Sequence, residues 1–104
     1  MVKLSVLYAN APGCTFNMDY YLNTHMKIVR EQLGPALKGV QVEQGLGGVP
    51  PGTPSPFLAA GHLLFDSLEA FQAAFTPTAA AAIQGDIPNY TNVPPILQMG
   101  EVKL

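Results

Sequence analysis

Charged residues are scarce in this sequence of 104 residues. Only 12% of the residues are charged, whereas 48% are hydrophobic. A typical domain carries roughly 25% charged residues, so this chain has few charges with which to cover the surface of a monomer. The length allows a single domain, residues 1–104. The shortage of charge therefore predicts that part of the apolar surface is buried against a second copy, in a homodimer.

Basic residues are especially few, and this excludes two kinds of partner. Lys and Arg together number 5, and the net charge is −2. So few cations cannot build the basic patch that nucleic acid requires, and the same shortage argues against anionic membrane surfaces. Gly and Pro interrupt every apolar stretch before it reaches the ~18 residues of a membrane span. We therefore expect neither a nucleic-acid nor a membrane partner.

The sequence also lacks the residue patterns of disulfides, metal sites and nucleotide sites. One cysteine, Cys14, excludes a disulfide within the chain and fits a reducing cytoplasm. The N-terminal segment has no apolar core of a signal peptide, so we expect a cytoplasmic protein. Two histidines without HxH or HxxxH spacing predict no metal site, and Gly45-Leu46-Gly47-Gly48 does not match the dinucleotide motif. We expect no cofactor.

The hydrophobic pattern predicts four strands and two helices. Alternating residues predict strands over 2–9, 40–46, 57–66 and 96–102, with a Gly- and Pro-rich loop over 45–56. A helix is predicted from Asn17, its N-cap, to Gly34-Pro35, and another after Ser67, broken at Pro77 and resumed over 79–83. The order β-α-β-β-α-β is that of a ferredoxin-like α+β fold, with a four-stranded antiparallel sheet and both helices on one face.

The third predicted strand has two apolar faces. Residues 57, 59, 61, 63 and 65 form one face, and Leu58, Ala60, His62 and Leu64 form the other. The helices can cover only one of these faces. A second copy that supplied its own sheet would cover the other and close a dimeric α+β barrel.

His25 is the first candidate for chemistry. Spacings of three and four residues place it on one face of the first helix, with Met18, Leu22, Met26, Val29 and Leu33. This face predicts that His25 points into a cavity between the helix and the sheet, where imidazole can act as an acid or base. Tyr21 lies one turn away and is the predicted catalytic partner. A core histidine held by a hydrogen bond, with aromatic packing around it, explains the same residues.

Four further residues are predicted to line a ligand site. His62 lies in the middle of the third strand and needs a partner if it is buried. Tyr20 is a neighbour of Tyr21, and Asn89 and Tyr90 belong to the polar segment 86–92, which either rims a pocket or leads into the last strand. The pattern does not decide whether His25 and His62 share one pocket.

The sequence resembles the EthD-like family over essentially its whole length. The opening strand, residues 16–30, GDIPNYTN at 85–92 and GHLLFDSLEAFQAAF at 61–75 carry the resemblance, and its most specific element is Tyr20, Tyr21 and His25. The resemblance implies a dimeric α+β barrel. It also implies a part in small-molecule catabolism, as an auxiliary or binding protein in the degradation of ethers such as ethyl tert-butyl ether.

Two hypotheses of function follow. The first is a binding or auxiliary protein for a small apolar molecule. The second is a cofactor-independent isomerase, lyase, cyclase or monooxygenase that acts on a small apolar or aromatic substrate with His25 as acid or base; this one comes from related barrels, by analogy of fold. An enzyme needs His25 in a cavity with Tyr or Asp at hydrogen-bond distance, whereas a passive binder needs only apolar walls.

Overall fold

A four-stranded antiparallel sheet forms one layer of the molecule. A computed structural model describes all 104 residues. The spatial order of the strands is β2-β3-β1-β4, with β1 paired to both β3 and β4 and β2 paired to β3. Their bounds are β1 Val2–Ala9, β2 Gly39–Gln44, β3 Phe57–Phe65 and β4 Ile96–Glu101. The predicted ferredoxin-like α+β fold is confirmed, although the last three strands were predicted to run one or two residues too far.

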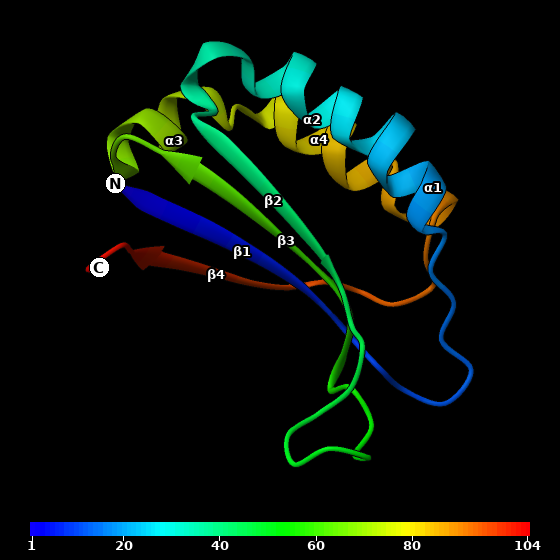
Figure 1. The fold of residues 1–104 in the computed structure, drawn as a ribbon. Helices are drawn as coiled ribbons and strands as arrows, with labels where there is room; N and C mark the ends of the chain where they lie inside the picture. Colours follow the sequence, from blue (N-terminus) through cyan, green and yellow to red (C-terminus); the bar gives the residue numbers. More distant parts are fainter.

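The helices form the second layer, on one face of the sheet (Figure 1). The segment after β1 contains α1 Met18–Tyr20, the π-helical turn η1 Tyr21–His25, α2 Met26–Leu33 and the short 3₁₀ turn η2 Gly34–Ala36. The segment after β3 contains α3 Leu68–Ala74, α4 Pro77–Gly85 and the 3₁₀ turn η3 Ile87–Asn89. None of the helices is both long and apolar enough to cross a membrane.

Side-chain caps explain where the helices begin. The Asn17 side chain accepts a hydrogen bond from the Tyr20 backbone N–H, and Ser67 accepts one from Ala70, so both predicted N-caps are confirmed. Thr76 caps α4 in the same way, and Pro77 occupies its first turn, where the missing N–H costs nothing. Pro77 therefore starts a new helix.

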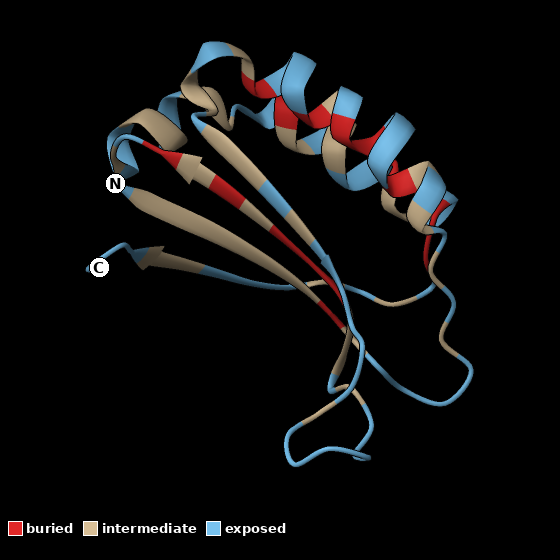
Figure 2. Ribbon diagram, in the orientation of Figure 1, coloured by how far each residue is buried: buried red, intermediate tan, exposed pale blue.

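The hydrophobic core lies between the sheet and the helices. Figure 2 shows buried positions on the sheet-facing sides of the helices and along β3. In β3, Ala59, Leu63 and Phe65 are buried and face the helices, with Phe65 fully enclosed. The nine residues of the main core cluster are Tyr8, Tyr21, Met26, Val29, Leu33, Ala59, Leu63, Phe65 and Tyr90. Three of the nine are tyrosines, so the core includes phenol groups that need polar neighbours.

The opposite face of the sheet is not covered by any element of the same chain (Figure 1). It carries Leu7 opposite Ala60, Ser5 opposite His62 and Lys3 opposite Leu64. The loop 45–56 extends beyond the sheet, and its Leu46 and Val49 are exposed. An uncovered face that includes large apolar side chains is the feature that the homodimer hypothesis requires.

The helix face predicted for His25 is correct for His25 and wrong for Leu22. Leu22 is 47% exposed, whereas Tyr21 is buried. The prediction assumed a regular α-helix, but the π turn adds a residue to one turn and shifts the side chains before it around the axis. Tyr21 therefore takes the inward position next to His25.

Candidate functional site

The π turn places Tyr21 and His25 side by side in the core. The backbone N–H of Met26 donates to the carbonyl of Tyr21, five residues earlier, which is the π-helical pattern. The two rings stack with centroids 5.4 Å apart and an interplanar angle of 14°. Both side chains are buried, Tyr21 at 1% and His25 at 3% exposure. The predicted proximity of Tyr21 and His25 is confirmed, and their chemical roles stay predictions.

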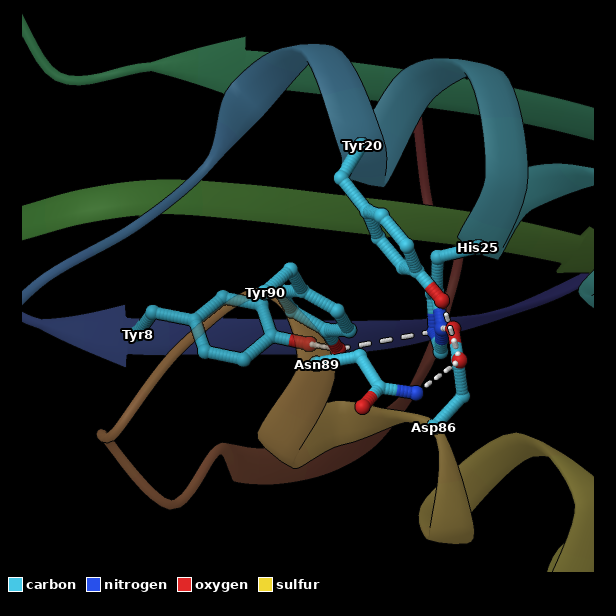
Figure 3. A network of polar contacts seen from close by, with 6 residues as sticks. All are labelled: Tyr8, Tyr20, His25, Asp86, Asn89 and Tyr90. Carbon is cyan, nitrogen blue, oxygen red and sulfur yellow. Dashed lines mark hydrogen bonds and ion pairs between the residues drawn. The ribbon is translucent and has the colours of Figure 1, made fainter.

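Asp86 holds His25 from the other helical segment. Its Oδ2 lies 2.9 Å from Nδ1 of His25, and both side chains are buried. Its Oδ1 accepts hydrogen bonds from the Tyr20 hydroxyl at 2.6 Å and from the Asn89 amide at 2.9 Å (Figure 3). Three donors therefore satisfy one buried carboxylate, which is the condition for burying such a charge.

The surroundings hold His25 neutral and Asp86 ionised. Burial lowers the pKa of His25 below its ordinary value, and the hydrogen bond to Asp86 opposes this effect without reversing it. Burial alone raises the pKa of Asp86, but the hydrogen bonds from Tyr20, Asn89 and His25 outweigh it and leave the pKa below its usual value. At neutral pH the pair is therefore a carboxylate beside an uncharged imidazole.

The pairing also fixes which nitrogen of His25 can take a proton. An ionised carboxylate only accepts hydrogen bonds, so Nδ1 carries the hydrogen and Nε2 keeps a lone pair. The Tyr90 hydroxyl lies 3.5 Å from Nε2, a long contact, and 2.6 Å from the Tyr8 hydroxyl. Nε2 is thus a base whose one hydrogen-bond partner, the Tyr90 hydroxyl, is held weakly.

A small cavity lies beside this network, between the sheet and the helices. Its volume is about 70 Å³, and 11 of its 15 lining residues are hydrophobic, a number that includes Tyr8 and Tyr21. Tyr8, Tyr21, His25 and Gln84 supply the polar groups, and no charged side chain lines it. Leu97, at its edge, is 52% exposed, so the cavity reaches the surface beside β4. The prediction that His25 faces a cavity rather than bulk solvent is confirmed.

His62 lies on the opposite face of the sheet and does not join His25. Its Nδ1 is 3.2 Å from the Ser5 hydroxyl, and its Nε2 is 2.8 Å from Oε1 of Glu43. The three side chains form a row across β1, β3 and β2, in the order of a hydrolytic Ser-His-Glu triad. Because β1 is paired on both sides, its backbone N–H groups are engaged in the sheet and cannot form an oxyanion hole beside Ser5. Ser5 and Glu43 supply hydrogen-bond partners for both ring nitrogens of His62, and this explains the row structurally. The ligand-binding role predicted for His62 stays a prediction.

The other predicted residues gather around Asp86 and His25. Tyr20 and Asn89 bind Asp86, and Tyr90 lies between His25 and Tyr8 with its ring centroid 4.6 Å from that of His25. No group of three or more His, Cys, Asp or Glu side chains that could hold a metal ion is present.

Sequence reasoning missed two members of the network, Tyr8 and Asp86. Tyr8 lies in the alternating pattern that predicts the strand over 2–9, and a phenol on the inward face of a strand needs a polar partner. Asp86 was noted only as the start of a polar segment, and it lies 61 residues from His25. The signal available in the sequence was Asp86 itself, a single acidic residue close to the end of a predicted helix. Such a residue is a possible partner for a predicted core histidine.

Comparisons with known proteins agree with this fold. Among solved structures, an EthD-like protein from Ralstonia eutropha JMP134 is 40% identical, with a TM-score of 0.91 over 99% of this chain and 92% of its own. A protein of the ethyl tert-butyl ether EthD family from Bacillus halodurans C-125 is 24% identical, with a TM-score of 0.71 over 99% of both chains. A protein from Thermobifida fusca YX, described as dimeric, ferredoxin-like and of unknown function, is 14% identical, with a TM-score of 0.59 over 97% of this chain and 90% of its own.

The sequence comparisons identify the family. No curated protein matches the chain. The sequence profile of the EthD domain matches residues 16–94, well over half of the chain. The chain therefore belongs to the EthD domain family.

Proposed function

We propose that this protein binds a small apolar molecule in the cavity between the helices and the sheet and transfers a proton on it, with His25 as the acid-base group. One observation carries the proposal: Asp86 lies 2.9 Å from Nδ1 of His25, and the ring of His25 lines the cavity. The carboxylate fixes the tautomer of the imidazole and stabilises the imidazolium that forms when Nε2 takes a proton.

The reaction class follows from the groups at the cavity. An imidazole that is neutral at neutral pH can remove a proton from a weakly acidic C–H or O–H group. It can later return this proton to another atom of the ligand. The phenols of Tyr8 and Tyr21 line the same cavity and can donate hydrogen bonds to a ligand in it. Isomerisation, elimination and ring closure need such a base and such donors, so a cofactor-independent isomerase, lyase or cyclase is the function that the geometry supports best.

A two-step experiment tests this proposal. Thermal shifts with candidate ethers, alcohols, ketones and aromatic polyketides identify a ligand. Turnover of that ligand is then measured with the wild-type protein and with His25→Gln, whose fold is checked by circular dichroism and by retained ligand binding. We expect loss of turnover with the fold preserved. Near-normal turnover by a well-folded His25→Gln protein contradicts the proposal.

The second candidate is a binding or auxiliary protein in the degradation of ethers or similar apolar compounds. The apolar walls of the cavity favour it, since 11 of the 15 lining residues are hydrophobic. The same experiment separates the two candidates. Tight binding without turnover, unaffected by His25→Gln, supports the binding protein, and turnover that depends on His25 supports the enzyme.

We also propose that the protein is a homodimer through the uncovered face of the sheet. The scarcity of charge and the apolar residues on that face support this assembly. Leu7→Lys and Leu64→Lys place charges on this face, whereas Leu22→Lys places one on the exposed side of the helical layer, where the leucine is already 47% exposed. Sedimentation should show a dimer for the wild type and for Leu22→Lys, and a monomer for Leu7→Lys and for Leu64→Lys. A wild-type monomer at micromolar concentration contradicts the proposal.

A further inference from the structure

Three phenol groups, those of Tyr8, Tyr21 and Tyr90, lie close together, and two of them, Tyr8 and Tyr21, line the cavity. The hydroxyls of Tyr8 and Tyr90 are 2.6 Å apart, and the rings of Tyr8 and Tyr21 meet edge to face with centroids 5.8 Å apart. The Tyr21 hydroxyl lies directly over Gly61, at a place that a side chain at position 61 would occupy. Tyr8, Tyr21, Gly61 and His25 all line the cavity. The phenols therefore come from three separate elements and converge beside the imidazole.

The chain from His25 through Tyr90 to Tyr8 allows the protons of these two phenols to reverse their direction when His25 takes a proton. Each phenol has one O–H hydrogen, which can point to either side of the hydroxyl oxygen, according to the acceptor that is present. While Nε2 has a lone pair, Tyr90 donates toward Nε2 and Tyr8 donates to Tyr90. After Nε2 takes a proton it becomes a donor toward Tyr90, so Tyr90 can donate to Tyr8. The hydrogen of Tyr8 is then free to point into the cavity beside that of Tyr21.

The cavity favours a neutral molecule on which negative charge develops. Burial raises the pKa of Tyr8 and of Tyr21 far above the ordinary range, so both remain protonated donors at every working pH. No lysine or arginine lines the cavity to balance a permanent anion. Hydrogen-bond donors in a cavity that excludes water stabilise an oxyanion strongly, because their dipoles need no reorientation of solvent.

We infer that Tyr8 and Tyr21 form an oxyanion hole and that the substrates are neutral, apolar, enolisable carbonyl compounds. This inference rests on the proposed proton transfer by His25. Nε2 of His25 removes a proton from the carbon next to the carbonyl group. The electron pair of that C–H bond forms a C=C bond, and the pair of the C=O bond moves to oxygen. Tyr8 and Tyr21 donate to this oxygen, and His25 returns the proton to carbon or oxygen.

Phenols test the oxyanion hole without the need for a known substrate. The oxygen of 4-nitrophenol resembles an enolate oxygen, and its ionised form absorbs visible light, so affinity and ionisation are read from one titration. Toluene has a ring but no hydroxyl and reports on the cavity alone. The variants are Tyr8→Phe and Tyr21→Phe. Thr24→Val is the control, because it removes a hydroxyl from the helical segment that carries Tyr21, and Thr24 is exposed and does not line the cavity.

The expected result is selective for the hydroxyl of the probe. Tyr8→Phe and Tyr21→Phe should each weaken 4-nitrophenol binding about tenfold, the value of one hydrogen bond to a charged group, and lower the ionised fraction of the bound probe. Toluene binding by each variant, and 4-nitrophenol binding by Thr24→Val, should change less than about threefold, which is within the effect of an exposed substitution. Equal losses for toluene and 4-nitrophenol, or no loss for either, overturn the oxyanion hole.

A separate measurement distinguishes this inference from the proposed function. Hydrogen–deuterium exchange at the carbons next to the carbonyl group of cyclohexanone, followed by NMR, reports proton transfer. His25→Gln should abolish the catalysed exchange and leave toluene binding unchanged. Exchange that persists in His25→Gln contradicts the proposed function, even if phenol binding depends on the tyrosines. Exchange that depends on His25 but is unaffected by Tyr8→Phe and Tyr21→Phe contradicts the oxyanion hole alone.

Discussion

Replacement of Asp86 by alanine is the sharpest test of the network. The change removes the acceptor of three hydrogen bonds, from His25 at 2.9 Å, Tyr20 at 2.6 Å and Asn89 at 2.9 Å. Tyr20 and Asn89 are accessible enough for water to replace the lost acceptor. Nδ1 of His25 is different, because His25 is only 3% exposed and its N–H is left without a partner.

The magnitude follows from this difference in exposure. A buried donor that loses its partner costs about 1–3 kcal/mol, and each of the two accessible bonds contributes about 0.5 kcal/mol. The pKa of Asp86 is lowered in the fold, so the network stabilises the ionised carboxylate despite its burial. We therefore expect Asp86→Ala to reduce the free energy of unfolding by about 3 kcal/mol.

Urea unfolding monitored by circular dichroism measures this loss. Asp66→Ala is the matched control, because the Asp66 carboxylate is 64% exposed and lies 3.8 Å from Nζ of Lys38. An exposed pair of this kind contributes about 0.5 kcal/mol or less. Both variants are compared at one protein concentration, since the stability of a dimer depends on concentration. If the two variants lose the same free energy of unfolding, the Asp86 network contributes nothing special and the reasoning is refuted.

Three further predictions follow from the same structure. Folding lowers the pKa of His25 from 6.5 and that of Asp86 from 3.8, so the unfolded chain takes up these protons at a higher pH than the folded protein does. The free energy of unfolding should therefore fall as the pH drops below 6.5 and fall further below 3.8. Urea unfolding at a series of pH values measures this change. Gly61→Ala should cost about 1–3 kcal/mol in the same assay and weaken phenol binding, because its Cβ displaces the Tyr21 hydroxyl. Removal of residues 49–52 from the exposed loop should leave the unfolding midpoint almost unchanged, and a large loss would show that the loop packs against a partner.

The fold was predictable because its signals are local. Alternating residues marked the strands, and Asn17 and Ser67 marked the starts of helices, with caps that the structure contains. The order of the elements then left few possible topologies. Strand ends were less certain, because a residue such as Gly45 can extend a strand or begin a loop, and only the pairing with β3 decides between them.

The site was only partly predictable, because its contacts are not local. The position of His25 followed from the helix face, but its partner Asp86 lies 61 residues away. Leu22 was misplaced because a π turn leaves no trace in the spacing of apolar residues. The two faces of the third strand were assigned correctly, yet the alternation does not say which face the helices cover. For this reason the separation of His62 from His25 needed the structure.

The network divides its charge in a way that suits proton transfer. Its anionic end, Asp86 with Tyr20 and Asn89, does not line the cavity, whereas His25 and the phenol of Tyr8 do. A proton that passes from a neutral ligand to Nε2 creates an anion on the ligand and a cation on His25. The cation then lies between two negative groups, the ligand and Asp86, so the charges created in the apolar cavity arise as neighbours of opposite sign. A buried histidine without Asp86 would have to form an unpaired imidazolium, which burial strongly disfavours.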